Sequence, residues 1–453
     1  MKKPKGFDRM LQGTRDVRAN VSLAAVLDEA RQRFADANPN SRARQNEAAA
    51  SLPGGNTRAV LWYRPFPVSF VSGEGCRVTD LDGHTYVDLV SEYSAGFYGH
   101  SDKAISAALV DVIQGGIMLG APNRYEARLA AAVVDRFPAI ERVRFCNSGT
   151  EANIMAISAA RAITQRSKIL AFREGYHGGV LTFAHGGSPL NLPFPFVFAD
   201  YNDSAGAVAL IKEQGDELAA VIVEPMMGGG GCIPATREFL EALRAATKET
   251  GALLIFDEVM TSRLDYRALH GAHEIFPDFV TLGKYIGGGA SFGAFGGRAD
   301  LVDRFDPALP GAFSHGGTFN NNILSMAAGL TGLTQVLTQE ASRAINSRGD
   351  RLREAMNVSL ERYGVEGIVI GRGSLMNLHF VRGPVDTPAR LDDADPSAIA
   401  LWHIEMLLRG YYVTPRGMLA LSLPFGDAEL DGFAAAFDDF LSSNLKILPR
   451  RTN

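Results

Sequence analysis

Residues 252–284 read ALLIFDEVMTSRLDYRALHGAHEIFPDFVTLGK, and this stretch decides the fold class. It holds two short apolar runs, ALLIF and FVTLG, which end directly before the charged residues Asp257-Glu258 and Lys284. Similar β-rich runs alternate with helical stretches from about residue 100 onward: VRFCNS, KILAF, AAVIVEP and FGAFGG. Strands that alternate with helices indicate βαβ units, so the sequence predicts an α/β fold with a mostly parallel sheet flanked by helices.

The regions on either side of this α/β block have a different pattern of predicted helices and strands. Residues 15–50 are predicted to be helical, and a Gly/Pro-rich break, SLPGGNTR, follows at 51–58. The segment VSFVSGEGCRVTDLDGHTYVDL, residues 68–89, alternates around Gly-Glu-Gly and Asp-Gly turns, which is typical of a β-meander. After residue 335 the pattern is helix, short strands, helix. We therefore predict a large α/β domain and a smaller α+β domain built from both ends of the chain, divided as residues 1–95, 96–335 and 336–453.

The composition restricts the partners of this protein. Its 45 basic and 50 acidic side chains give a net charge of −5, which argues against a nucleic-acid or anionic-membrane surface. Cys76, Cys146 and Cys232 lie far apart without a CxxC motif, so we expect no disulfide framework, no metal site and a cytoplasmic location. No apolar run approaches the roughly 18 residues of a membrane span. The basic start MKKPKG has no apolar run behind it, so no secretory signal is expected.

Polar motifs cluster where the predicted strands end. Asn147-Ser148-Gly149-Thr150 follows VRFC, Glu224 follows AAVIV, Asp257 follows ALLIF, and Lys284 follows FVTLG. In an open parallel sheet, ligands bind outside the carboxyl ends of the strands. The joint occurrence of these motifs therefore predicts a single cleft.

The motif NSGTEAN, residues 147–153, runs from a Gly-containing turn into a predicted helix. Backbone N–H groups at a helix start, with the Ser148 and Thr150 hydroxyls, suit a phosphate. The alternative is an ordinary capping box of Ser148 and Glu151. Thr318, beside glycines in HGGTFNNN, is a second phosphate candidate or a plain turn residue.

Asp257 and Lys284 suggest the chemistry of the cleft. A strand-end carboxylate is costly to desolvate without a partner, and a protonated pyridine nitrogen is one such partner. Partial burial of Lys284 would lower its pKa and favour the neutral amine that attacks an aldehyde. The alternatives are a salt bridge or metal ligand for Asp257 and a solvated surface lysine for Lys284. Tyr176 and His177 offer an aromatic face for a planar cofactor and Val259 an opposite face, although each also suits a core.

As a set, these residues resemble the class III aminotransferases of pyridoxal-phosphate (PLP) fold type I. The matching motifs span roughly residues 50 to 440: Ser148-Gly149-Thr150, Tyr176-His177-Gly178, Asp257-Glu258-Val259, Lys284 and Gly317-Thr318. DEVMTS and TLGKYIGGG are similar to the glutamate-1-semialdehyde aminomutase branch. LPGGNTRAVLWYRPFP, with Arg58, and GYYVTPRGMLALSLP, with Arg416, instead resemble the β-phenylalanine aminotransferases.

The resemblance implies PLP as the cofactor, with Lys284 forming its Schiff base and shuttling the proton, and with Asp257 at the pyridine nitrogen. It also implies a homodimer in which Thr318 reaches across to the partner's phosphate site. The remaining implied roles are phosphate contacts from Ser148, Gly149 and Thr150, ring contacts from Tyr176, His177 and Val259, site organisation by Glu224, and substrate carboxylate contacts from Arg58 and Arg416.

The substrates follow from the same resemblance: an aromatic β-amino acid as donor and 2-oxoglutarate as acceptor. A guanidinium grips a carboxylate bidentately, so two arginines at different distances suit these two acids, provided that the fold brings them together. The alternative for each arginine is a surface ion pair. Leu61, Trp62, Tyr63 and Phe66 form either a pocket for the substrate ring or part of the core. The rival functions are a glutamate-1-semialdehyde 2,1-aminomutase and a non-catalytic binding protein of the same fold.

Overall fold

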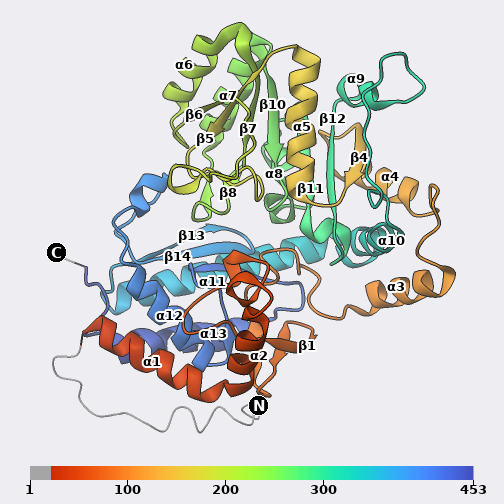
Figure 1. Cartoon of the computed structure of the whole chain (residues 1–453). Helices are drawn as coiled ribbons and strands as arrows, with labels where there is room; N and C mark the ends of the chain where they lie inside the picture. The colour runs from red at the N-terminus through yellow and green to blue at the C-terminus, as the bar shows by residue number, and fades with distance from the viewer. Residues whose placement is uncertain (1–21, 452–453) are drawn as a thin grey trace.

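The computed structural model describes residues 22–451, so the basic start and the first part of the predicted N-terminal helix lie outside the described residues. A seven-stranded sheet with the order β4-β12-β11-β10-β7-β5-β6 forms the centre of the larger lobe (Figure 1). Only β12 runs antiparallel to its neighbours. The mostly parallel sheet is therefore confirmed, and β6 is a strand that the sequence prediction lacked. The bounds are β4 (Arg142–Cys146), β5 (Lys168–Phe172), β6 (Phe196–Ala199), β7 (Leu218–Val223), β10 (Leu253–Asp257), β11 (Phe279–Gly283) and β12 (Gly293–Gly297).

Helices cover both faces of this sheet. Alternate strand residues point to opposite faces: Ile169 packs with α5 (Gly149–Thr164), and Leu170 packs with α7 (Arg237–Thr250). α7 buries residues on one stripe, is capped by Thr236 and ends at Gly251, whose φ of 73° suits a residue without a side chain. The other helices of this lobe are α3 (Lys103–Gly115), α4 (Glu126–Arg136), α6 (Ser204–Gln214), α8 (Ala268–His273), α9 (Ala299–Val302) and α10 (Ile323–Thr331).

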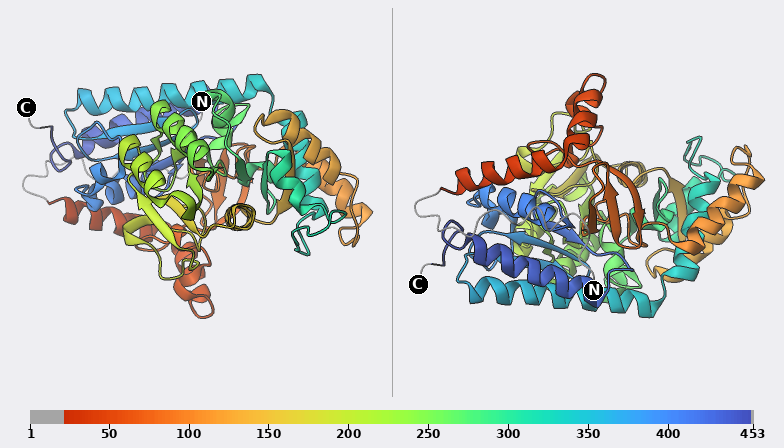
Figure 2. Two further views of the ribbon diagram at one scale, coloured as in Figure 1. Left: turned by 90° about the horizontal axis from the view of Figure 1, so that it is seen from above. Right: turned by 90° about the horizontal axis from the view of Figure 1, so that it is seen from below.

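Both ends of the chain build the smaller lobe (Figures 1 and 2). The meander strands β1 (Phe70–Glu74), β2 (Arg77–Asp80) and β3 (Thr85–Asp88) are joined by β15 (Tyr411–Tyr412), which pairs parallel to β3. A second sheet has the order β13-β14-β16, and α1 packs on α12. The division at residues 95 and 335 stays a prediction. The remaining bounds are α1 (Leu23–Ala37), α2 (Pro39–Ala49), α11 (Gln339–Arg362), β13 (Ile368–Arg372), β14 (Leu375–His379), α12 (Pro396–Leu408), β16 (Met418–Ala420) and α13 (Asp427–Asn444).

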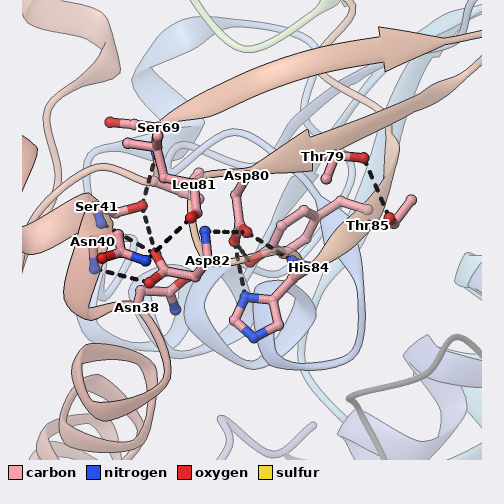
Figure 3. A network of polar contacts seen from close by, with 12 residues as sticks. Asn38, Asn40, Ser41, Ser69, Thr79, Asp80, Leu81, Asp82, His84 and Thr85 are labelled. Carbon is pink, nitrogen blue, oxygen red and sulfur yellow. Dashed lines mark hydrogen bonds and ion pairs between the residues drawn. The ribbon is translucent and has the colours of Figure 1, made fainter.

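A polar network fixes the start of α2 on the meander (Figure 3). The Asp82 carboxylate accepts hydrogen bonds from the backbone N–H groups of Asn40 (2.8 Å) and Ser41 (3.1 Å). Asn38 caps α2 without a side-chain hydrogen bond, so Asp82 satisfies helix donors that would otherwise lack partners. Because α2 leads into the loop that carries Arg58, the network helps to hold that loop.

No helix among residues 22–451 is long and apolar enough to cross a bilayer. Cys76, Cys146 and Cys232 are buried free thiols.

Candidate active site

Lys284 and Asp257 lie at the same edge of the seven-stranded sheet. β10 and β11 are parallel neighbours, and Asp257 is in register with Thr281, so the two strands end close together. Lys284 follows β11 with a φ of 54° and is half-buried. Burial lowers the pKa of the Lys284 amine to about 8, while the carboxylates of Asp257 and Glu224 oppose that change. Burial therefore raises the fraction of neutral amine near physiological pH well above that of an ordinary lysine.

The Asp257 carboxylate is 4% exposed and is surrounded by N–H donors. Its Oδ2 accepts hydrogen bonds from Asn153 Nδ2 at 2.7 Å and from His177 Nδ1 at 2.8 Å. Its Oδ1 accepts one from the Val259 N–H at 3.0 Å. Burial acts to lower the pKa of His177, but the hydrogen bond to Asp257 prevails and raises it. His177 is thus a partner of the carboxylate.

Asn153 is a site residue that the sequence analysis missed. It also donates to the His177 carbonyl oxygen at 2.9 Å and accepts a hydrogen bond from Thr281 Oγ1 at 2.6 Å. The available signal was its spacing, because Asn153 lies one helical turn after Gly149 on the same face of α5.

α5 begins at Gly149, directly after the short turn that follows the end of β4 at Cys146. Ser148 caps the helix, since its Oγ accepts a hydrogen bond from the Glu151 N–H at 3.1 Å. Glu151 does not complete the capping box on Ser148; its carboxylate accepts from the Asn147 N–H at 2.8 Å instead. Thr150 Oγ1 accepts from the Gly179 N–H at 3.3 Å. The cap is therefore observed, and it leaves other first-turn N–H groups of α5 available to an anion, because a cap satisfies only part of these donors.

Two glycines bring the backbone close to this turn. A Cβ on Gly149 would lie 2.7 Å from Val259 Cγ1, and a Cβ on Gly178 would lie 2.3 Å from Thr150 Oγ1. Gly178 also has a φ of 127°, which L side chains rarely adopt. Side chains at these two positions would therefore fill the space beside the helix start.

Glu224 holds the backbone around Tyr176. Its Oε1 accepts a hydrogen bond from the Tyr176 N–H at 3.1 Å, and its Oε2 accepts one from the Gly228 N–H at 2.9 Å. Burial raises the pKa of Glu224 to about 7, while the charge of His177 opposes the rise. The Tyr176 side chain remains 48% exposed, so its ring is available to a ligand.

Arg58 and Arg416 both lie close enough to Tyr93 and Tyr176 for their charges to act on these phenols. Burial raises the pKa of the Tyr93 phenol, and the positive charges of Arg416 and Arg58 oppose that rise. The same two charges oppose the rise in the pKa of Tyr176, so both arginines lie near these two rings. Arg58 forms an ion pair with Glu92, and its guanidinium lies 5.5 Å from the Tyr93 ring centroid. Arg416 is exposed in the turn before β16 and has no hydrogen bond or ion pair with another residue of 22–451.

A strained turn carries Glu92 and Tyr93. Ser91, Glu92, Tyr93 and Ser94 have φ values of 44°, 51°, 54° and 74°. Successive left-handed residues other than glycine are costly, and such strain persists only where the surroundings impose it. The Asp88 carboxylate contributes by accepting hydrogen bonds from the Val90 and Ser91 N–H groups at 2.7 and 3.0 Å. Residues 91–94 include no glycine, so the sequence does not predict this left-handed turn.

Other predicted residues lie elsewhere. Thr318 is exposed between α9 and α10, and no described contact joins it to Ser148 or Lys284. Tyr63 and Phe66 pack against Phe34 in the core, so the core alternative holds for them. Trp62 is exposed.

Comparison with known proteins points to one family. The class III aminotransferase model matches residues 60–394. A β-phenylalanine transaminase from Variovorax paradoxus is 48% identical over 95% of this chain and 99% of its own length. A glutamate-1-semialdehyde 2,1-aminomutase from Geobacillus thermodenitrificans is 35% identical over 87% of this chain and 96% of its own.

Solved structures agree with the sequence comparison. A β-phenylalanine aminotransferase from Variovorax paradoxus superposes with a TM-score of 0.94 at 48% identity, covering 95% of this chain and 100% of that one. A transaminase with PLP bound superposes with a TM-score of 0.84 at 31% identity, covering 90% and 98%.

Proposed function

This chain belongs to the class III aminotransferases, which bind PLP, and on that premise we propose that it transfers the amino group of an aromatic β-amino acid, such as β-phenylalanine, to 2-oxoglutarate. The products are a β-keto acid and glutamate. The observation that carries this proposal is the convergence of Arg58 and Arg416 beside Tyr176. The similarity to a β-phenylalanine transaminase supports the choice of donor.

The residues at the strand ends fit the cofactor. Lys284 supplies an amine of lowered pKa for the PLP aldehyde, and Asp257 supplies a buried carboxylate for the pyridine nitrogen. The N–H groups at the start of α5, with Ser148 and Thr150, suit the phosphate, and Gly149 leaves the space that a Cβ would fill. The exposed ring of Tyr176 suits stacking on the pyridine.

When bound, PLP supplies an electron sink that stabilises negative charge at the substrate carbon. In this proposal Lys284 Nζ would hold the cofactor, and the same nitrogen would move the proton at the reacting carbon. Asp257, held by Asn153 and His177, keeps a negative charge beside the pyridine nitrogen. Borohydride should fix the cofactor on Lys284, and mass spectrometry that located it on another lysine would overturn the assignment.

The two arginines divide the carboxylates between them. Arg416 has no protein partner among the described residues, so it is free to take the carboxylate that lies away from the reacting carbon in both substrates. Arg58 forms an ion pair with Glu92. In this proposal, the α-carboxylate of 2-oxoglutarate or glutamate replaces Glu92 as its partner. An aromatic β-amino acid lacks that second carboxylate.

Single-turnover measurements of each half-reaction test this division. Arg416→Ala should impair both halves, and Arg58→Ala should mainly impair the half with 2-oxoglutarate. Each affected half should lose roughly 1.5–3 kcal/mol of transition-state stabilisation, which is about ten- to a hundredfold or slightly more in kcat/KM. Equal losses in both halves for Arg58→Ala would refute the division.

A screen of α-, β- and ω-amino acids with 2-oxoglutarate, read out as glutamate formed, tests the substrate class. Activity confined to α- or ω-amino acids would refute the β-amino acid donor. Absence of glutamate with every donor, together with conversion of glutamate-1-semialdehyde, would indicate the aminomutase instead. Protein that stays colourless with added PLP would indicate a non-catalytic binding protein.

We also propose a homodimer with the sites at its interface. α3 and the loop after it expose apolar side chains, with Met118 at 73%, beside the segment that carries Thr318. Asn123 Nδ2 donates to the Asn321 carbonyl oxygen at 2.7 Å, so the two segments adjoin, and Figure 1 shows α3 and α10 on one side of the molecule. An exposed apolar patch of this kind is typical of an interface. Its members are Val110, Ile113, Ile117, Met118, Leu119 and Phe319.

Subunit complementation tests the crossing of Thr318. Lys284→Ala and Thr318→Ala proteins, each impaired alone, should regain about a quarter of full activity when refolded together, because half of the dimers would then contain one intact site. No gain on mixing would place Thr318 in its own subunit's site. Sedimentation that showed a fully active monomer would refute the dimer.

A further inference from the structure

Arg263 is a buried cation without an anionic partner. It lies in the short helix Thr261–Leu264 after β10, and its side chain is 1% exposed. It forms no ion pair with a carboxylate of residues 22–451, and burial lowers its pKa to about 9. Its guanidinium carbon lies 3.9 Å from the centroid of the Phe97 ring. An unpaired buried charge is destabilising unless hydrogen bonds compensate, so its retention needs a reason in the surrounding contacts.

The guanidinium instead donates to three oxygens from three separate segments. Nη1 donates to the Ser94 carbonyl oxygen at 3.1 Å, and Nε donates to Ser374 Oγ at 3.2 Å. Nη2 donates to the Leu421 carbonyl oxygen. A planar group with several fixed N–H directions can serve three acceptors at once, which an ammonium on a flexible stem does less well.

One of these segments carries the partners of Arg58, and another carries Arg416. Ser94 ends the strained turn that holds Glu92 and Tyr93. Leu421 directly follows β16, the strand entered from the turn that carries Arg416. These two segments also contact each other, because Ser91 Oγ donates to the Ala420 carbonyl oxygen at 2.9 Å. Arg263 lies shortly after β10, the strand that ends at Asp257. Its hydrogen bonds therefore hold the 91–94 turn and the segment after β16 near that strand end.

We propose that Arg263 is a positioning residue of the transamination site, which holds the 91–94 turn and the 413–421 segment at a set distance from Lys284. The substrate carboxylate is thereby held at a fixed position relative to the Lys284 amine. The inference rests on the proposed roles of Arg58 and Arg416. The charge of Arg263 also acts on Lys284 in the direction that favours its neutral amine.

Arg136 provides a matched control. It is a second buried arginine without a carboxylate partner among the described residues, and its guanidinium lies 4.0 Å from the Tyr266 ring centroid. It donates to the carbonyl oxygens of Leu333 at 2.6 Å and Leu337 at 3.3 Å. These acceptors follow α10 and lie outside the two substrate-side segments.

The experiment compares Arg263→Lys and Arg263→Met with Arg136→Lys and Arg136→Met in the PLP-loaded protein. Glutarate, a dicarboxylate without a reacting carbonyl, serves as the probe, and its dissociation constant is measured by calorimetry. Loss of hydrogen bonds from a charged donor should weaken glutarate binding about ten- to a hundredfold in the Arg263 variants. Amide hydrogen exchange at 91–97 and 418–423 should accelerate, while exchange at 253–257 and PLP retention stay unchanged. Ser374→Ala, which removes one acceptor, should shift binding in the same direction by less and provides a milder variant if Arg263→Met fails to fold.

Unchanged glutarate binding and unchanged exchange at 91–97 in the Arg263 variants would overturn the inference. Equal losses in the Arg136 variants would also overturn it, because the effect would then be general destabilisation. Arg416→Ala separates this inference from the proposed function. If Arg416→Ala leaves glutarate binding intact, the assignment of the arginines fails, and hydrogen exchange at 91–97 alone decides the role of Arg263.

Discussion

Replacing Asp257 with Asn removes one negative charge and keeps the shape of the side chain. The carboxylate receives three N–H groups, from Asn153, His177 and Val259. An amide of the same shape keeps one oxygen and introduces two N–H bonds. If the amide oxygen faces Asn153 and His177, the amide NH₂ group faces the Val259 N–H. In the opposite orientation, the NH₂ group faces the N–H groups of Asn153 and His177. At least one donor is therefore left without an acceptor, at a cost of about 1–3 kcal/mol in the free energy of unfolding.

The effect on catalysis should be larger than the effect on the fold. Without the negative charge, the pyridine nitrogen of PLP loses the partner that keeps it protonated, and the electron sink weakens. We expect the chemical step to slow by at least about a hundredfold, or about 2.7 kcal/mol. PLP should still bind, because the phosphate contacts proposed at the start of α5 do not involve Asp257.

Stopped-flow absorbance of the donor half-reaction measures the chemical step, and titration with PLP measures binding. Asn153→Ala is the control, since it removes one hydrogen bond and keeps the carboxylate, and it should slow the step much less. An Asp257→Asn protein that binds PLP and reacts at the parent rate would show that another group protonates the ring.

Three further predictions concern the same site. The rate at which cofactor-free protein captures PLP should rise with pH and level off above about 8, because burial lowers the pKa of Lys284 to about 8; a rise that continued toward the ordinary lysine value of about 10.4 would contradict this. Gly149→Ala should weaken PLP binding, because its Cβ would lie 2.7 Å from Val259 Cγ1, and adding Val259→Ala should restore part of it with a coupling of about 0.5–3 kcal/mol; purely additive losses would refute the contact. The pKa of Glu224 is raised from 4.5 to about 7 in the folded protein, so the folded state holds a proton that the unfolded state releases, and stability falls as pH rises through this window. Glu224→Gln should lack this fall, of about 1–3 kcal/mol, and equal pH slopes in urea unfolding of both proteins would be inconsistent with it.

The sequence determined the elements whose signals are local. Buried strands such as ALLIF and FVTLG are continuous apolar runs, and their ends are marked by charged residues. Parallel neighbours end at the same edge of a sheet, so the proximity of Asp257 and Lys284 followed from the βαβ pattern alone. Ser148 could be placed at a helix start because capping uses residues three positions apart. The edge strand β6 was missed because FVFA is short and follows Pro193 and Pro195, and prolines within an apolar run weaken its strand pattern.

Tertiary structure decided the contacts between residues far apart in the chain. His177 and Asn153 became partners of Asp257 only when the end of β10, the start of α5 and the 176–182 loop packed together. From the sequence, Tyr63 and Phe66 suited a substrate pocket and the core equally well. The structure places them in the core, because Phe34 of α1 packs against both rings. The left-handed turn at 91–94 contains no glycine, and besides the preceding Asp88 it is held by Ala420 and Arg263, which reach it from other segments. The pairing of β15 with β3 brings the segment of Arg416 beside the turn with Tyr93, and such a hydrogen-bonded register between distant segments has no counterpart in local sequence pattern.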